Sequence, residues 1–185
     1  MTPGGSFLRH LCLLWLVGIS TRITILAVPP LIPLIREDLR MSEAEVGLLV
    51  GLPVLTWALA AIPGSLLIAR LGATFTLAAG LAVTGLAAAG RGAAPDVWAL
   101  YAATMLMGCG IAVMQPALPT LVREWVPHRI GLGTAVSSNG MMVGVAAGPA
   151  LTIPFVLPLF DQSLRLSFVW WAAPVLALAL VFPLL

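Results

Sequence analysis

The sequence predicts an all-α membrane protein with six transmembrane helices. Hydrophobic residues make up 61% of its 185 residues and charged residues only 9%, and the mean hydropathy is +1.09. Soluble domains carry about 25% charged residues, so the lipid bilayer is the expected partner of most of the surface. A helix needs about 20 apolar residues to cross the hydrocarbon core. Six apolar stretches of about this length alternate with short polar breaks.

The breaks define the expected spans. The first break, residues 36–45, is the most polar part of the chain, and within it Ser42 and Glu45 have the spacing of a capping box for the second helix. The later breaks are 70–72, 91–96, 123–129 and 161–165. The expected spans are therefore 11–35, 46–69, 73–90, 97–122, 131–158 and 165–185. The connections are short, so neighbouring helices should be antiparallel, and the nearly featureless third and sixth spans should face lipid.

The N-terminus only superficially resembles a signal peptide. Arg9 and His10 precede an apolar stretch, but that stretch is too long and no small-residue cleavage site follows it, so we expect no cleavage. Arginines divide equally between the two sides of the membrane. The acidic residues gather on one side, and we expect the N-terminus to be cytoplasmic, in the plasma (inner) membrane. Cys12 and Cys109 lie in apolar stretches and should be free, buried thiols.

Arg22 is the most informative residue. It is the one charge in the first apolar stretch, which contains no acidic residue. A charge at this depth costs roughly 2.5–3.5 kcal/mol and usually faces a protein interior or a water-filled path. We expect Arg22 to bind an anionic ligand through charge-assisted hydrogen bonds. The alternative is that it bonds backbone carbonyls that prolines have freed in a neighbouring helix.

A weak internal repeat suggests a transporter. Segments 30–37 and 116–124 both read P-x-x-P, then apolar residues, then Arg-Glu, and they start 86 positions apart. Three spans separate the two copies, so they have opposite orientations, which is typical of the 3+3 inverted repeats of secondary transporters. The alternative is that apolar helices with prolines simply look alike.

The repeat also relates two helix faces. One face carries Gly18, Arg22, Pro29 and Pro33, and the positions 86 residues later are Thr104, Gly108, Gln115 and Pro119. We expect these faces to line an aqueous path in which Thr104 and Gln115 give the substrate neutral polar contacts. Glycines four residues apart let helix backbones approach closely, and we expect a packing role for Gly47, Gly51, Gly140, Gly144, Gly148 and the adjoining Pro149.

Segment 22–51, with its Pro-Leu-Ile-Pro-Leu-Ile-Arg run and Met41-Ser42, resembles the cyanate transporter and nitroimidazole-resistance branch of the major facilitator superfamily. This resemblance implies that residues 1–185 form the N-terminal six-helix half of a twelve-helix fold. The superfamily loop G-x-x-x-D-R-x-G-R-[RK] aligns with residues 65–74. Arg70 and Gly72 match it, which implies a gating role, whereas the aspartate and the final basic pair are replaced.

Other branches of the superfamily match less well. Drug/proton antiporters have an arginine in the fourth helix, where this chain has Thr104. Their fifth-helix G-x-x-x-G-P-x-x-G is only partly met, by Gly144, Gly148 and Pro149, with Thr152 in the last place. Nitrate/nitrite porters are similar around residues 35–39, but they carry their substrate arginine in the second helix, where this chain has none.

The expected function is secondary transport of a small anion of the cyanate or nitrite type by alternating access. The chain stops after six spans, so the resemblance implies a second six-helix half, either a missing C-terminal half or a second copy. One alternative is a drug efflux carrier of the same superfamily, and another is a non-transporting truncated membrane protein. The sequence contains no nucleophile–base pair, metal cluster or phosphate loop, so we expect no enzyme activity, cofactor or metal. The net charge of +2 is too small to suggest nucleic acid.

Overall fold

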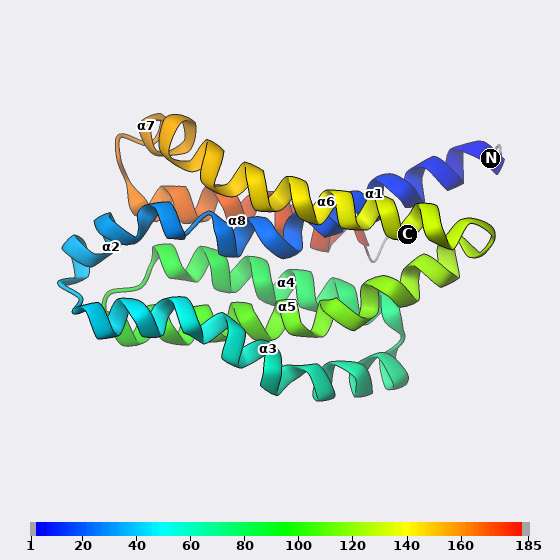
Figure 1. Cartoon of the computed structure of the whole chain (residues 1–185), viewed down its shortest axis with the longest axis horizontal. Helices are drawn as coiled ribbons and strands as arrows, with labels where there is room; N and C mark the ends of the chain where they lie inside the picture. The colour runs from blue at the N-terminus through cyan, green and yellow to red at the C-terminus, as the bar shows by residue number, and fades with distance from the viewer. Residues whose placement is uncertain (1–2, 183–185) are drawn as a thin grey trace.

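Helices dominate the computed structural model, which describes residues 3–182, with side chains from Ser6 onward except that of Ala61 (Figure 1). Within that range six helical segments are long and apolar enough to cross a membrane, as the sequence predicted. These spans are Ser6–Leu39, Glu43–Ala60, Ala73–Gly92, Val97–Trp125, Pro127–Leu159 and Leu164–Val181.

Two of the spans, the first and the fifth, are built from more than one element. The first comprises α1 (Pro3–Leu26), the 3-10 turn η1 (Pro29–Leu31) and α2 (Ile32–Leu39). The middle three helices are α3 (Glu43–Leu71), α4 (Ala73–Gly92) and α5 (Val97–Trp125), and α3 continues beyond its most apolar part. The fifth span comprises η2 (Pro127–Arg129), α6 (Ile130–Leu151), the π-helical η3 (Thr152–Val156) and α7 (Leu157–Leu159), and the sixth is α8 (Leu164–Val181).

The two proline motifs differ in local structure. The first span breaks before Pro29 and Pro30, and α2 restarts at Ile32. Two consecutive prolines remove two successive N–H donors, so the helix cannot continue its hydrogen bonding there. In the second motif Pro116 and Pro119 lie three residues apart, and α5 continues through both.

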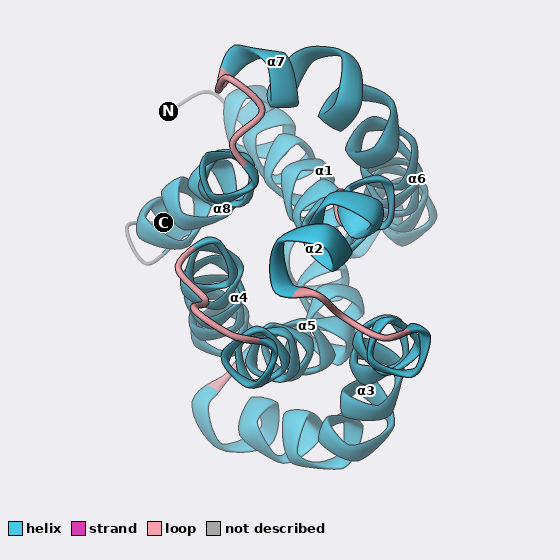
Figure 2. Cartoon of the chain, turned by 90° about the vertical axis from the view of Figure 1, so that its left-hand side faces the viewer, coloured by secondary structure: helices cyan, strands magenta, loops and turns pink. Residues whose placement is uncertain are grey.

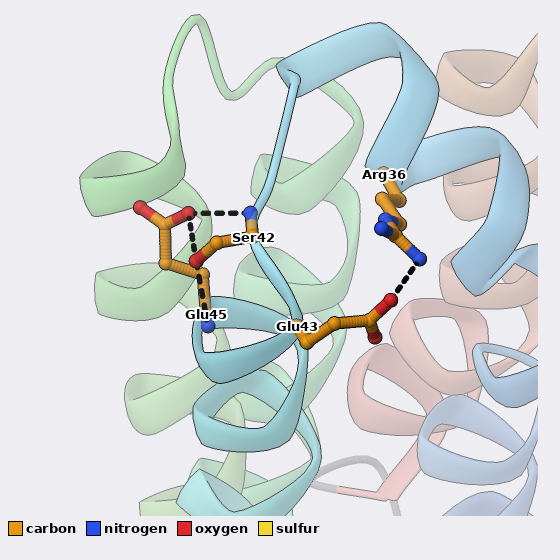
Figure 3. A network of polar contacts seen from close by, with 4 residues as sticks. All are labelled: Arg36, Ser42, Glu43 and Glu45. Atoms are coloured by element: carbon orange, nitrogen blue, oxygen red, sulfur yellow. Dashed lines mark hydrogen bonds and ion pairs between the residues drawn. The ribbon is translucent and has the colours of Figure 1, made fainter.

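The connection from α2 to α3 shows the predicted capping box (Figure 3). The Ser42 hydroxyl accepts a hydrogen bond from the Glu45 N–H at 3.3 Å, and the Glu45 carboxylate accepts one from the Ser42 N–H at 2.7 Å. Arg36 forms an ion pair with Glu43 across the same turn. Both side chains of that pair are exposed, so it contributes little on its own. The capping box is the feature that starts α3.

We expect Ser42→Ala to lower the stability of the protein by about 1 kcal/mol, because the change removes one side of the capping box. For a chain of this size that corresponds to a fall of about 2–4 °C in the melting temperature. The measurement is thermal unfolding in detergent, followed by circular dichroism. Ser138→Ala is the matched control, since Ser138 is exposed on α6. Equal melting temperatures for Ser42→Ala and the wild type would contradict this role.

The helices pack mainly as neighbours that are not consecutive in the chain. Helix α1 lies along α6, α3 lies along α5, and α4 lies between α5 and α8 (Figures 1 and 2). The main core fills the space between α1, α4, α5 and α8, and its fully buried members include Leu14, Val17, Leu77, Leu81, Met107, Ile111, Met114, Leu121, Val175 and Phe182. The second and fifth spans are therefore left with the most exposed surface.

The expectation that the third span faces lipid is wrong. In the third span 56% of the most apolar window is buried and in the sixth 39%, compared with 22% in the second and 28% in the fifth. Helix α4 is buried because its small residues admit close neighbours. A Cβ added at Gly85 would meet the Leu176 side chain of α8 at 2.6 Å, and one at Gly80 would meet the Met114 side chain of α5 at 2.5 Å.

Candidate functional site

Arg22 connects two helix pairs. It lies on α1, and its Cβ is 3.1 Å from the place that a Cβ added to Gly144 of α6 would occupy. Its guanidinium carbon lies 5.1 Å from the centre of the Trp57 ring on α3, which is a cation–π distance. Both side chains are only partly buried. The α1–α6 pair and the α3–α5 pair thus meet at Arg22 and Trp57.

Both residues have hydrogen-bond donors without acceptors. Among the described side chains Arg22 has the Trp57 ring as its polar partner, with no hydrogen bond or ion pair. The Trp57 indole Nε1 is buried and also lacks a partner among the residues that the structure describes. A buried donor such as this one is normally satisfied, and both the indole N–H and the guanidinium can only donate. An acceptor-only ligand, such as an anion, matches this pair of groups.

Thr104 and Gln115 do not converge on one point. Both lie on α5, and their separation of 11 residues corresponds to about 16 Å along the axis. Thr104 is buried, and its hydroxyl donates to the Leu100 carbonyl at 2.8 Å. Gln115 is partly buried. A small ion beside one of these side chains cannot touch the other.

The two predicted faces contribute to helix contacts as well. A Cβ at Gly18 would collide with the Ser137 carbonyl of α6, and one at Gly108 would collide with the Thr56 hydroxyl of α3. The small residues at these positions therefore bring helices together, and Arg22 is the charged side chain that remains between them.

The glycine motifs fall into two groups. Gly140, Gly144 and Gly148 of α6 lie against the α1 backbone, where added Cβ atoms would collide with the Trp15 carbonyl, approach the Ile19 carbonyl to 2.6 Å and approach the Ala27 nitrogen to 3.0 Å. Gly47 and Gly51 of α3 have no atom within 4 Å of an added Cβ. Pro149 is exposed on α6. The α3 glycines thus leave an open face.

The loop residues lie at one end of the bundle. Arg70 is exposed in the last turn of α3, and Gly72 alone joins α3 to α4 with φ +81°, a left-handed conformation that favours glycine. Cys12 and Cys109 are free thiols. Cys12 is exposed and Cys109 partly buried, so the expectation that both are buried is wrong for Cys12.

Arg91 is a buried cation that the sequence analysis placed in a break. It lies in the last turn of α4 and is only 4% exposed. Its Nη1 donates to the Thr24 carbonyl at 3.3 Å and to the Met107 sulfur at 3.2 Å. Arg91 thus makes the contact that was the alternative role for Arg22, a hydrogen bond to a backbone carbonyl freed by a proline break. The length of the third span was the sequence signal that Arg91 belongs to the helix, because this span reaches 20 residues only if it includes Arg91.

These six spans can be compared with known proteins. The sequence profile of the Major Facilitator Superfamily matches residues 14–185. The chain belongs to the major facilitator superfamily. It is similar to the cyanate transport protein CynX of Escherichia coli (strain K12), with 29% identity over 164 residues, which is 89% of this chain and 42% of the relative. It is also similar to the 2-nitroimidazole transporter of the same strain, with 29% identity over 177 residues, which is 92% of this chain and 40% of the relative.

A third relative is the uncharacterized transporter YycB of Bacillus subtilis (strain 168), with 28% identity over 167 residues, which is 90% of this chain and 41% of the relative. This member of the major facilitator superfamily thus spans about two fifths of the length of the curated relatives it matches. By name these relatives are transporters and not enzymes. With its apolar helices, the chain is an integral membrane protein with several spans.

Proposed function

We propose that this chain is the N-terminal half of a secondary carrier that moves a small anion by alternating access, with Arg22 as the substrate contact. The observation that carries the proposal is the pair formed by Arg22 and Trp57. Its donors have no acceptor among the described residues, and it lies where two helix pairs meet. A cation at this depth is costly, and a bound anion offsets that cost.

The structure favours the anion over an uncharged organic substrate. The names of the two Escherichia coli relatives point to cyanate and to 2-nitroimidazole. No acidic residue lies within the first four expected spans, that is, in residues 11–35, 46–90 or 97–122, so no side chain in these apolar stretches neutralises Arg22 or Arg91. A negative substrate gains from both the guanidinium and the indole N–H.

The same carrier needs a second six-helix half. The two spans with the most exposed surface are the second and the fifth, and Gly47 and Gly51 leave the α3 backbone open to a close neighbour. We propose that α3 and α6 face this second half, either a C-terminal half or a second copy. The N-terminus would lie in the cytoplasm and the bundle in the plasma membrane.

The contact pattern supports the proposed 3+3 inverted repeat. The repeat would exchange the first span with the fourth, the second with the fifth and the third with the sixth. This exchange turns the α1–α6 contact, between the first and fifth spans, into the α3–α5 contact, between the fourth and second spans. It leaves the α4–α8 contact, between the third and sixth spans, unchanged, and all three contacts are extensive. The match is incomplete, because the extensive α4–α5 contact has a smaller counterpart between α1 and α8. The break near Pro29 gives the first span a place to bend.

The test is a competition assay on the complete carrier, that is, this chain with its second half, in proteoliposomes. We expect uptake of labelled cyanate or nitrite to be inhibited by other small monovalent anions and unaffected by an equal concentration of neutral 2-nitroimidazole. Liposomes without protein are the control for leakage. Inhibition by 2-nitroimidazole with no inhibition by anions would favour drug efflux and overturn the anion assignment.

A further inference from the structure

The end of the bundle near α2 contains a cation with too few acceptors. Arg91 is 4% exposed and lies among α1, α5 and α8, with its guanidinium carbon 4.9 Å from the centre of the Phe168 ring. Its two hydrogen bonds both come from Nη1, and one of the acceptors is a thioether, which is weak. Its Nε is buried without a partner. Three of the five N–H groups, on Nε and Nη2, therefore have no acceptor among the described residues.

Among the described residues no carboxylate forms an ion pair with Arg91. Asp38 lines a hollow beside Arg91, but within the described part of the chain it forms no ion pair with the guanidinium. Asp38 is also exposed, so solvent screens it. An isolated buried charge is very unfavourable, and a cation–π contact with one phenylalanine offsets only a small part of that cost.

The break in the first span holds one side of the guanidinium in place. In a continuous helix the Thr24 carbonyl would accept from the Val28 N–H, but that N–H bonds the Ile25 carbonyl at 3.3 Å. The Thr24 carbonyl is therefore available to Arg91 Nη1. Because this bond fixes one nitrogen, the remaining N–H groups are held in a defined orientation.

Arg91 lines a hollow of about 50 Å³ between α1, α3 and α5. The walls include Ile25, Pro29, Pro53 and Met107, and the Thr104 hydroxyl is already committed to the Leu100 carbonyl. A cavity needs roughly 10–15 Å³ to hold one water, so this hollow admits a small ion but no bulky organic acid. Apart from Arg91 its walls offer few donors, which favours ions that lose their water easily.

We propose that this hollow is a second binding site, at Arg91, for a small, weakly hydrated monovalent anion such as chloride, bromide or nitrate. The anion would accept hydrogen bonds from the free N–H groups and supply the missing negative charge. The hollow lies about one helical turn from the Arg22–Trp57 pair, since it contains Ile25 and Pro53. The site does not require Arg22 to touch substrate, so it stands separately from the proposed carrier function.

The test uses the 185-residue chain in detergent and the line width of ³⁵Cl NMR, which broadens when chloride exchanges with a protein site. We expect broadening that nitrate displaces and sulfate does not. These variants are compared in an Arg22→Gln background, so that the proposed substrate contact cannot contribute to the signal. In that background Arg91→Gln should remove the displaceable part, whereas Arg165→Gln, a change at an exposed arginine beside the smaller hollow, should retain it.

Two further variants keep the test decisive if Arg91→Gln does not fold. Thr104→Leu fills the hollow without changing the charge and should reduce the displaceable broadening at least tenfold. Thr104→Val, which has nearly the original shape, should leave it unchanged. The proposal is overturned if the Arg22→Gln chain shows no nitrate-displaceable broadening, or if Thr104→Leu or folded Arg91→Gln retains it in that background. Broadening that Arg22→Gln alone abolishes would overturn the Arg91 site, while assigning the anion to Arg22 and supporting the proposed function.

Discussion

Arg22→Gln in the complete carrier is expected to reduce the initial rate of small-anion uptake by about 10–100-fold. A hydrogen bond to a charged group contributes about 1.5–3 kcal/mol, and each 1.4 kcal/mol is a factor of ten. Glutamine keeps a polar side chain of intermediate length but loses the positive charge. The measurement is uptake of labelled cyanate or nitrite into proteoliposomes, normalised to the amount of reconstituted protein.

The matched control for this prediction is Arg123→Gln. Arg123 is exposed in the last turn of α5, so neutralising it removes the same charge without touching the Arg22–Trp57 pair. Size-exclusion chromatography of both variants shows whether each one folds and remains dispersed. Normal uptake by well-folded Arg22→Gln would mean that Arg22 only joins α1 to α3 through Trp57, and the anion assignment would be wrong.

Gly140→Ala should have the largest effect on stability. The added Cβ would collide with the Trp15 carbonyl of α1, and its next nearest neighbours are also α1 backbone atoms at 3.0 and 3.2 Å. Backbone cannot move aside as a flexible side chain can, so α1 and α6 must separate. Overpacking of this kind costs about 1–3 kcal/mol. We expect thermal unfolding in detergent to show a fall in melting temperature of several degrees.

The same substitution at Gly47 should have the opposite sign. Gly47 lies within α3, and an added Cβ would meet nothing within 4 Å. Replacing a mid-helix glycine by alanine stabilises a helix by roughly 0.5–1 kcal/mol, so the isolated chain should gain slightly. A loss of stability in Gly47→Ala equal to that in Gly140→Ala would contradict the distinction between a packed and an open glycine motif.

Local sequence signals predicted the spans and their starts. The spacing of Ser42 and Glu45 was sufficient to predict the start of α3, because a capping box involves only residues three apart. Charges marked most ends of the spans, because lipid excludes them. The signal was misleading at Arg91, whose helix buries it in its last turn among three neighbouring helices.

The faces of the helices were harder to predict. The nearly featureless α4 was expected to face lipid, yet it is among the most buried of the spans. In a membrane, apolar side chains suit both lipid and protein contacts, so hydropathy does not indicate which face is buried. Small residues were the better signal, but Gly47 and Gly140 occur in the same motif and differ completely in their surroundings.

The candidate site was predicted in part. Arg22 was identified because a lone charge in an apolar helix needs a reason, whereas its neighbour Trp57, on a different helix, carried no local signal. Thr104 and Gln115 were grouped by their repeat positions, and the rise of a single helix separates them by more than a small ion can bridge.

The amino-acid sequence by itself determined that the chain crosses a bilayer in six helices, where most of these helices begin, and which cation needs an explanation. Each of these three conclusions follows from residues close together in the chain and from the cost of charge in lipid. Only the tertiary structure decided which helices are neighbours, that Arg22 meets Trp57, and that Arg91 bonds the Thr24 carbonyl. Those contacts join residues 35 and 67 positions apart, and in a uniformly apolar chain it is the shape of small residues, more than hydropathy, that selects them.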